Sequence, residues 1–260
     1  MNTQDDHREY VLTSENSKLI DNILSDIRRD PKTGRLVVPA LWKKEIQHLM
    51  SPNYNLAVSV LNSQKRKLSP ERLKEYDAVI QNQFEDGVIE RIADHPSFLR
   101  ENPDVSFLAH NAVFRNNSNT TKCRVVFLSN LSERKNEKCL SHNQCSMAGA
   151  NLNNKMQIST LLLRFDKYLL TYDLKKAFLQ LFLREEDTRK LLFLWFNGIS
   201  KNDFSIVGYR FRRVPFGMRY SPFLLMIALY YTLIHNVTDD DDEETQSIKG
   251  VCITFLTWIT

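Results

Sequence analysis

The sequence lacks the features that mark membrane-spanning and secreted proteins. Its 260 residues contain no apolar run of roughly eighteen residues, the length that a membrane-spanning helix needs. The first residues, Met1 to His7, are polar and include no apolar signal region. We therefore expect an intracellular, cytoplasmic protein with no membrane segment.

Cysteine is scarce, and no two cysteines form a Cys-x-x-Cys pair. In a reducing compartment the four cysteines are expected to be free thiols. Cys139, His142 and Cys145 could also be interpreted as a three-ligand metal cluster. Structural zinc has four ligands and tighter spacing, so we favour free thiols.

The composition predicts a globular domain with a modestly basic surface. Apolar residues make up 42% of the chain and charged residues 25%, which is typical of a protein with a packed core. The net charge is +4, and it becomes +10 without the six acidic residues from Asp239 to Glu244. A basic body suits a polyanionic partner. An ordinary basic protein with a solvated acidic loop has the same composition, so charge alone does not decide.

The order of apolar and turn-forming residues predicts a mixed α+β fold without internal repeats. The best-marked helix starts at Pro70 with Ser69 as its cap, and Gly87 ends it before extended residues. A second long helix is predicted from Ser221 to about Ile234, and loops at 94–121 and 129–154. Further predicted elements are a weakly amphipathic stretch at 19–27, a helix at 158–165, and strands at 36–38, 122–128, 169–173, 190–196, 209–214 and 251–259.

A run of β-forming residues, Leu169 to Tyr172, ends at Asp173. A carboxylate at a strand end can hold a divalent cation, and nucleotidyl transfer uses two such ions about 4 Å apart. Neighbouring strand ends could supply the carboxylates for the pair. An aspartate that caps the following helix gives the same local pattern, and spacing alone favours that interpretation.

Basic and aromatic residues gather in two other segments. Alternation along the strand before Val214 puts Arg210 and Arg212 on one face. The turn that follows contains Gly217, which permits close approach of a ligand. Lys122 and Arg124 begin another strand and could grip phosphates. Each segment alone is more often a solvated strand or connection, but basic and aromatic groups beside a glycine turn also suit bases and phosphates.

The order of these motifs is more specific than any one of them. A basic strand, then strand-Asp-Leu-Lys-x-Ala-Phe, then Pro-Phe-Gly-x-x-x-Ser-Pro resembles the plan of retroelement reverse transcriptases. The phrases Lys-Cys-Arg-Val-Val-Phe and Phe-Gly-Met-Arg-Tyr-Ser-Pro-Phe look most similar to Bel/Pao elements. So do Gly34-Arg35, Asn53-Tyr54 and the pattern from Tyr76 to Glu90. The resemblance covers roughly residues 33–236.

This resemblance implies an RNA-directed DNA polymerase with the fingers and a partial palm of a right-hand polymerase, and without a thumb. The implied partners are an RNA template, a DNA primer and deoxynucleoside triphosphates, and the chain would belong to a longer polyprotein. The implied divisions are a polar linker at 1–30, an N-terminal helical extension of the fingers at 31–95, fingers at 96–166, and a partial palm at 167–260 with an acidic loop at 237–247.

The resemblance also implies roles for individual residues. Asp173 would be the catalytic aspartate and would bind Mg²⁺ beside the backbone carbonyl of Leu174. Phe178 would exclude the 2′-hydroxyl of a ribonucleotide. The implied nucleotide-binding residues are Lys122, Arg124, Phe178, Phe216 and Gly217, and the implied nucleic-acid contacts are Arg210, Arg212 and Arg219.

The chain departs from the family pattern at two places. Leu128 stands where the family usually has Asp after the basic strand. The sequence also contains no Tyr-x-Asp-Asp or Tyr-x-Asp-Asn motif to supply a second metal-binding aspartate. The run Asp239 to Asp242 has no apolar strand beside it, so we expect a solvated loop there instead.

The final residues offer an explanation for the missing motif. If Leu256 to Thr260 is encoded with suitable codons, a shifted reading frame over the same bases gives Tyr-Met-Asp-Asn. We therefore expect a frameshifted or mis-spliced gene, or a decayed element. The predicted function is that of a reverse transcriptase domain that is inactive alone, and the alternative is a non-catalytic nucleic-acid-binding remnant.

Overall fold

The computed structural model describes residues 14–92, 102, 104–115, 123–133, 139–149 and 173–235, which form a mixed α+β fold. No helix in these ranges is both long and apolar enough to cross a lipid bilayer. In chain order the elements are α1 (Ser14–Asp26), β1 (Arg28–Arg29), β2 (Leu36–Val38), η1 (Gln47–Leu49), α2 (Tyr54–Lys67), α3 (Pro70–Glu85), β3 (Ile89–Arg91), β4 (His110–Phe114), β5 (Cys123–Phe127), α5 (His142–Cys145), η2 (Ala177–Gln180), β6 (Phe182–Leu183), α7 (Glu185–Thr188), β7 (Leu192–Gly198), η3 (Ile199–Lys201), β8 (Asp203–Phe211) and α8 (Ser221–His235).

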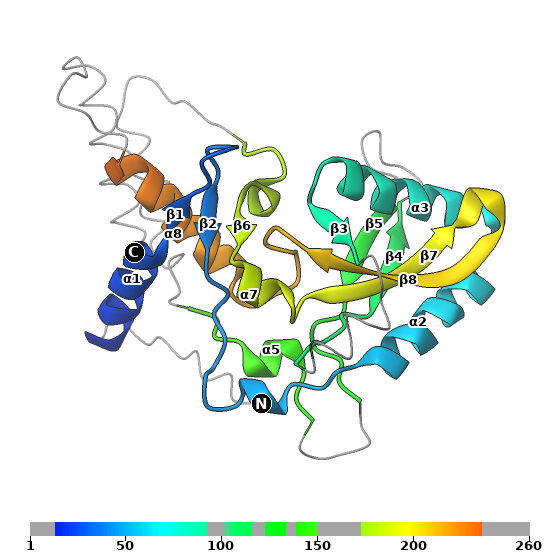
Figure 1. Ribbon diagram of the computed structural model, residues 1–260, viewed down its shortest axis with the longest axis horizontal. Coiled ribbons are helices and arrows are strands. Elements are labelled where there is room, and N and C mark those ends of the chain that lie inside the picture. The colour runs from blue at the N-terminus through cyan, green and yellow to red at the C-terminus, as the bar shows by residue number, and fades with distance from the viewer. Residues whose placement is uncertain are drawn as a thin grey trace, which may run out of the picture.

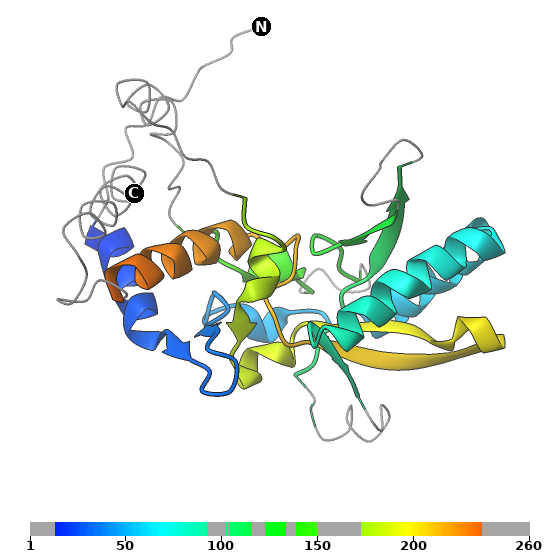
Figure 2. The same cartoon turned by 90° about the horizontal axis from the view of Figure 1, so that it is seen from above.

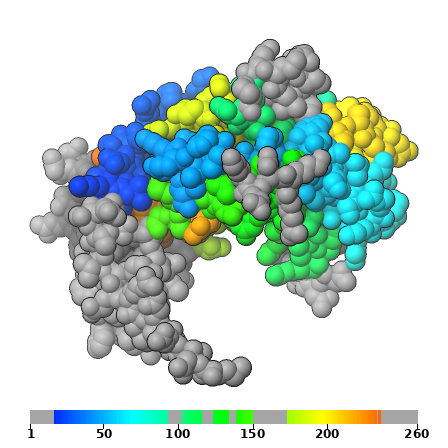
Figure 3. Space-filling model, turned by 90° about the horizontal axis from the view of Figure 1, so that it is seen from below, coloured from blue at the N-terminus to red at the C-terminus, as the bar shows by residue number. Residues whose placement is uncertain are grey.

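Three small sheets organise the described residues. The first has the order β1-β2-β6, the second β3-β8-β7, and the third is the β4-β5 hairpin. Figure 1 shows the first sheet beside α1 and α8, and the other two sheets beside α2 and α3. On the face seen in Figure 3, α2 (cyan) lies beside the tip of the β7–β8 hairpin (yellow) at one end of the molecule.

Helix α3 forms as its sequence signals predict. The Ser69 hydroxyl accepts a hydrogen bond from the backbone N–H of Arg72, and Pro70 occupies the first turn. Leu73, Tyr76 and Ile80 are buried, as expected for residues that recur on one helix face. Beyond the helix end Gly87 adopts a φ of +62°, and β3 follows.

The core is continuous from α1 to α8 and contains a buried polar link. One hydrophobic cluster extends from Ile23 to Ala228. Within it, His110 bonds through Nε2 to the Leu194 carbonyl at 2.9 Å and through Nδ1 to the Tyr76 hydroxyl. A carbonyl can only accept, so Nε2 carries the proton and Nδ1 accepts from Tyr76. This link joins α3, β4 and β7.

Several predicted elements are confirmed, and several others were missed. The strands at 36–38 and 122–128, the extended segment after Gly87 and the helix from Ser221 are present as β2, β5, β3 and α8. Helix α2 and strand β4 were not predicted, and β4 lies within the predicted loop at 94–121. The predictions at 158–165, 169–172, 239–244 and 251–259 lie outside the described residues.

The strands predicted at 190–196 and 209–214 form a hairpin, β7–β8, and β3 is paired with its second strand. We expected them in one palm sheet with residues 169–173. Residues 169–172 lie outside the described residues, so this expectation stays a prediction; β8 pairs with β7 on one edge and with β3 on the other, and Arg210 lies between Leu192 and Glu90. Both edges of β8 are therefore paired, and no further strand can pair with β8.

A buried carboxylate fixes the segment after β2. The two carboxylate oxygens of Asp187 accept hydrogen bonds from the backbone N–H of Ala40 at 2.8 Å and from Trp42 Nε1 at 2.9 Å. Burial raises the pKa of Asp187 to about 6, although both hydrogen bonds favour the charged form.

Replacing Asp187 with Asn should destabilise this junction. An amide can accept at its single oxygen only, so its NH₂ group would face one of the two donors. We expect Asp187→Asn to lower the free energy of unfolding by about 1–3 kcal/mol in urea titrations at about pH 7.5. The exposed neighbour Glu186 provides the control, because Glu186→Gln leaves both donors paired. Equal effects of the two substitutions would contradict this role.

Two buried histidines make stability depend on pH. Burial lowers the pKa of His110 and of His142 to about 4, whereas the usual value is 6.5. Between these values the unfolded chain binds protons that the folded chain does not. The free energy of unfolding therefore falls as the pH falls from about 6.5 towards 4. Protonation of Asp187 below about pH 6 acts in the opposite direction.

Removal of one titrating group should flatten this profile. His142 Nε2 bonds to the Lys190 carbonyl at 2.9 Å, a contact that a glutamine N–H can replace. We expect His142→Gln to reduce the loss of stability between about pH 6.5 and 4.5 by about 2 kcal/mol. Urea unfolding at several pH values measures this loss. His48 is exposed, so His48→Gln should leave the profile unchanged, and an unchanged profile for His142→Gln would refute the assignment.

Candidate functional site

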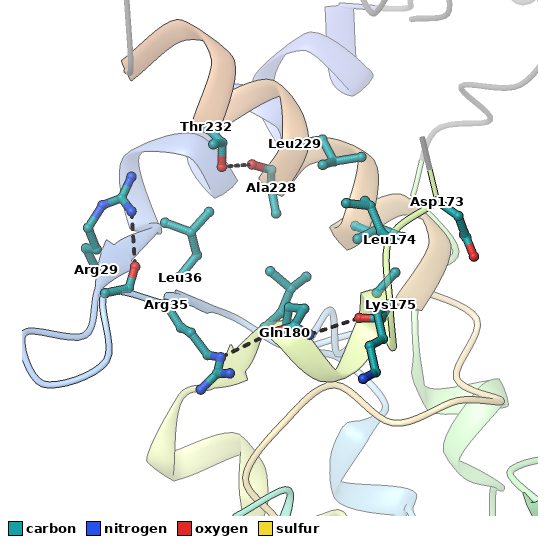
Figure 4. Close-up of a pocket in the computed structure, with 14 residues that line it drawn as sticks. Arg29, Arg35, Leu36, Asp173, Leu174, Lys175, Gln180, Ala228, Leu229 and Thr232 are labelled. Atoms are coloured by element: carbon teal, nitrogen blue, oxygen red, sulfur yellow. Dashed lines mark hydrogen bonds between the residues drawn. The ribbon is translucent and has the colours of Figure 1, made fainter. Parts of the chain in front are cut away.

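Asp173 is exposed and lies four residues before η2 in the chain, at the edge of a pocket of about 410 Å³. The pocket has an apolar lining from β2, η2 and α8, and Arg29, Arg35 and Lys175 also line it. Figure 4 shows the Asp173 carboxylate at the rim, directed away from the interior. Residues 169–172 lie outside the described residues, so the expected strand before Asp173 remains a prediction.

Phe178 and Phe216 come together although 38 positions separate them in the sequence. Their ring centroids are 4.9 Å apart, and the rings meet edge to face at 85°. Phe178 is half-buried in η2, whereas Phe216 is 50% exposed in the turn after β8. Lys176, at the start of η2, pairs with Asp86 at 2.6 Å and lowers the pKa of that carboxyl group. Helix η2 is thereby fixed to the end of α3.

Gly217 lies against the end of β5. Its φ is +93°, and a Cβ at this position would lie 3.1 Å from the Phe127 carbonyl oxygen and 3.5 Å from Ser129 Oγ. Both the backbone angle and the close approach require glycine. The predicted nucleotide-pocket turn therefore contacts the strand that carries Arg124.

Arg124 lies on the outer face of the β4–β5 hairpin, which projects from the body in Figure 2. It is exposed and pairs in register with Val113. Val113 and Val126 are 45% and 43% exposed, so this face combines apolar side chains with a cation. Within the described residues Arg124 forms no ion pair. Lys122 lies outside the described residues.

The other predicted cationic contacts are of two kinds. Arg210 bonds to Glu90 and, at 2.5 Å, to Glu185, and Arg212 pairs with the same two carboxylates. Their charges are therefore largely compensated within the protein. Arg219 is exposed, and its backbone N–H is held by Asn143 at 3.0 Å.

Sequence reasoning missed Asn143, which bonds to several of these segments. Its Nδ2 donates to Asn130 Oδ1 at 2.9 Å and to the Gly217 carbonyl at 3.1 Å. The capping box of α5, from Ser141 to Gln144, is readable in the sequence and marks the helix start. No sequence pattern indicates the partners of the Asn143 side chain.

The described residues offer one candidate metal ligand at this site rather than a cluster. Among them, no group of three or more His, Cys, Asp or Glu side chains is arranged to hold a metal ion. Cys123 and Cys145 are buried free thiols, and Cys139 is half-exposed. No known family model matches this chain, and no characterised protein matches it either.

A substitution at Gly217 tests how tightly the turn is held against β5. Gly217→Ala combines a positive φ with a clash against a backbone oxygen, and we expect it to lower the free energy of unfolding by about 2–3 kcal/mol. Gly34 is the matched control, because its φ is +69° and a Cβ there meets nothing within 4 Å. Gly34→Ala should cost about 1 kcal/mol. Equal losses in urea unfolding would show that the contact with Phe127 does not constrain the turn.

Proposed function

We propose that this chain is part of an RNA-directed DNA polymerase, a reverse transcriptase similar to those of Bel/Pao elements. The observation that carries the proposal is the contact of three motifs that are far apart in the sequence. Phe178 meets Phe216, and the adjacent Gly217 meets the end of the Arg124 strand. These are the motifs whose order resembles the family.

The chemistry of these groups suits a nucleotide and a nucleic acid strand. An exposed aromatic ring can stack on or pack against a base or sugar, and an exposed guanidinium can bind phosphate. In the proposed function Phe178 and Phe216 line the nucleotide pocket, and Arg124 holds the triphosphate. Arg210 and Arg212 are less suited to binding phosphate, since their carboxylate partners would have to be displaced.

Magnesium belongs to the proposal, but the described residues do not hold a complete site for it. Two-ion nucleotidyl transfer needs several oxygen ligands. Asp173 supplies the one carboxylate that the motif order assigns to this role, and no second aspartate motif follows in the sequence. We therefore expect the 260-residue chain to bind nucleic acid with little or no synthesis.

Binding of a fluorescent RNA–DNA primer–template to the 260-residue chain, titrated between about 50 and 200 mM salt, tests the proposal. We expect salt-sensitive binding. Arg124→Gln should weaken it at every sequence and reduce the slope of log K against log salt by about 1. Arg212→Gln removes the same charge from an ion-paired site and should have a smaller effect. Equal effects would contradict the role of Arg124.

A second candidate function is nucleic-acid binding without catalysis, which the single assigned carboxylate favours. Primer extension with magnesium and deoxynucleotides, run beside the titration, separates the two. Synthesis that is lost in Asp173→Asn would support the polymerase. Binding without synthesis is compatible with both functions, and nucleic-acid binding without catalysis is then the simpler description of this chain. Absence of binding even at low salt would overturn both functions.

A further inference from the structure

We propose that Asn143 is a positioning residue that holds the turn from Phe216 to Arg219 against the end of β5. This inference rests on the proposed function, because its consequence is the alignment of the nucleotide-pocket turn with the Arg124 strand. Nothing in the motif order points to Asn143. Its side chain makes three hydrogen bonds to segments on either side of this contact.

The Asn143 side chain connects three separate segments. Its Nδ2 group donates to Asn130 Oδ1 at 2.9 Å and to the Gly217 carbonyl at 3.1 Å. Its Oδ1 accepts from the backbone N–H of Arg219 at 3.0 Å. Asn130 follows β5, and Gly217 and Arg219 belong to the turn. A single amide therefore joins the loop after β5 to both sides of the turn.

The main chain of the same residue strengthens this connection. The backbone N–H of Asn143 donates to the Ser129 carbonyl at 3.0 Å, and its carbonyl accepts from Arg219 Nη1 at 3.5 Å. Asn143 is 8% exposed, so solvent cannot readily replace these bonds. The capping box of α5 fixes the backbone of Asn143, and this holds its side chain in place beside the turn.

Only an amide satisfies this set of partners. Both partners of Nδ2 are oxygen acceptors, and the partner of Oδ1 is an N–H donor. The side chain at this position must therefore carry donors and an acceptor together. Aspartate would place an oxygen against two acceptors. Leucine has a similar size but makes none of the bonds.

Other contacts keep the turn folded when Asn143 is changed. Ser221 Oγ donates to the Pro215 carbonyl at 2.7 Å, and Met218 and Tyr220 are buried at 3% and 0% exposure. These contacts preserve the internal shape of the turn and anchor its end in the core. Asn143 instead sets where Gly217 and Arg219 lie relative to β5. The variants should therefore fold, and the change should be local.

Hydrogen exchange measured on the 260-residue chain tests the positioning directly. We expect Asn143→Ala and Asn143→Leu to speed exchange of the Arg219 amide by about fivefold to tenfold, with no change in β7. Asn53→Ala is the matched control. Asn53 is also a buried asparagine, but its side chain bonds to Leu131 and Glu133. An unchanged Arg219 amide in both Asn143 variants would overturn the proposal.

Affinity for the labelled primer–template tests whether this position matters for binding. We expect both Asn143 variants to bind about threefold to tenfold more weakly than Asn53→Ala. Each variant is measured at the same interval below its own Tm, so that differences in stability do not enter the comparison. Equal affinities would reduce Asn143 to a purely structural residue and overturn the inference. If the unaltered chain binds no duplex, the proposed function fails. The exchange result then still decides whether Asn143 positions the turn.

Discussion

One buried arginine, Arg213, connects η2, the end of α3 and the segment after β8. Its side chain donates to the Leu179 carbonyl in η2 at 3.0 Å and to the Asp86 carbonyl at the end of α3 at 2.7 Å. Its guanidinium also lies over the Phe182 ring at 5.2 Å. A buried cation needs such acceptors, because an unpaired one would be strongly destabilising.

The position of Arg213 determines where the candidate site forms. Strand β8 is held on both edges until Phe211, and the chain then crosses to β6 through the bridge between Arg213 and Phe182. The backbone N–H of Val214 bonds to the Leu181 carbonyl directly after η2. The turn that follows must therefore begin beside η2. The Phe178–Phe216 contact follows from this crossing, because Phe178 shortly precedes Leu181 in the chain and Phe216 shortly follows Val214.

Elements with local signals could be predicted from the sequence. The hydroxyl cap, the proline and the apolar spacing of α3 are all contained within one segment, and so are the start of α8 and the strand β5. Helix α2 was missed although Asn53 stands at its cap position and basic residues fill its last turn. In the fold the Asn53 side chain bonds to the loop at 131–133 rather than to the helix. Strand β4 is stabilised by its pairing with β5, which local sequence does not reveal.

The same distinction applies to the candidate site. The residue types and their order identified the Phe178, Phe216 and Gly217 segments, but not their contacts. Strand alternation correctly placed Arg210 and Arg212 on one face, yet charge compensation depends on Glu90 and Glu185, which lie on other elements. Asn143 was missed for the same reason. The unpredicted part of the site consists of partners that only the fold brings together.

Exposed apolar side chains add a further physical reason to expect a ligand beside these segments. Val113 and Val126 lie on the outer face of the β4–β5 hairpin with Arg124, and Phe216 is exposed beside Phe178. Single exposed apolar residues are common and need no explanation. Here they occur together with Arg124, which forms no ion pair with any residue that the structure describes, and with a turn held in place by Asn143. Arg210 and Arg212 are instead neutralised by Glu90 and Glu185. In the proposed function the faces of bases and sugars cover these side chains, and the phosphates lie against Arg124. If the same residues lay on unconnected elements, they could bind bases or phosphates separately. They could not align a nucleotide with a nucleic acid strand.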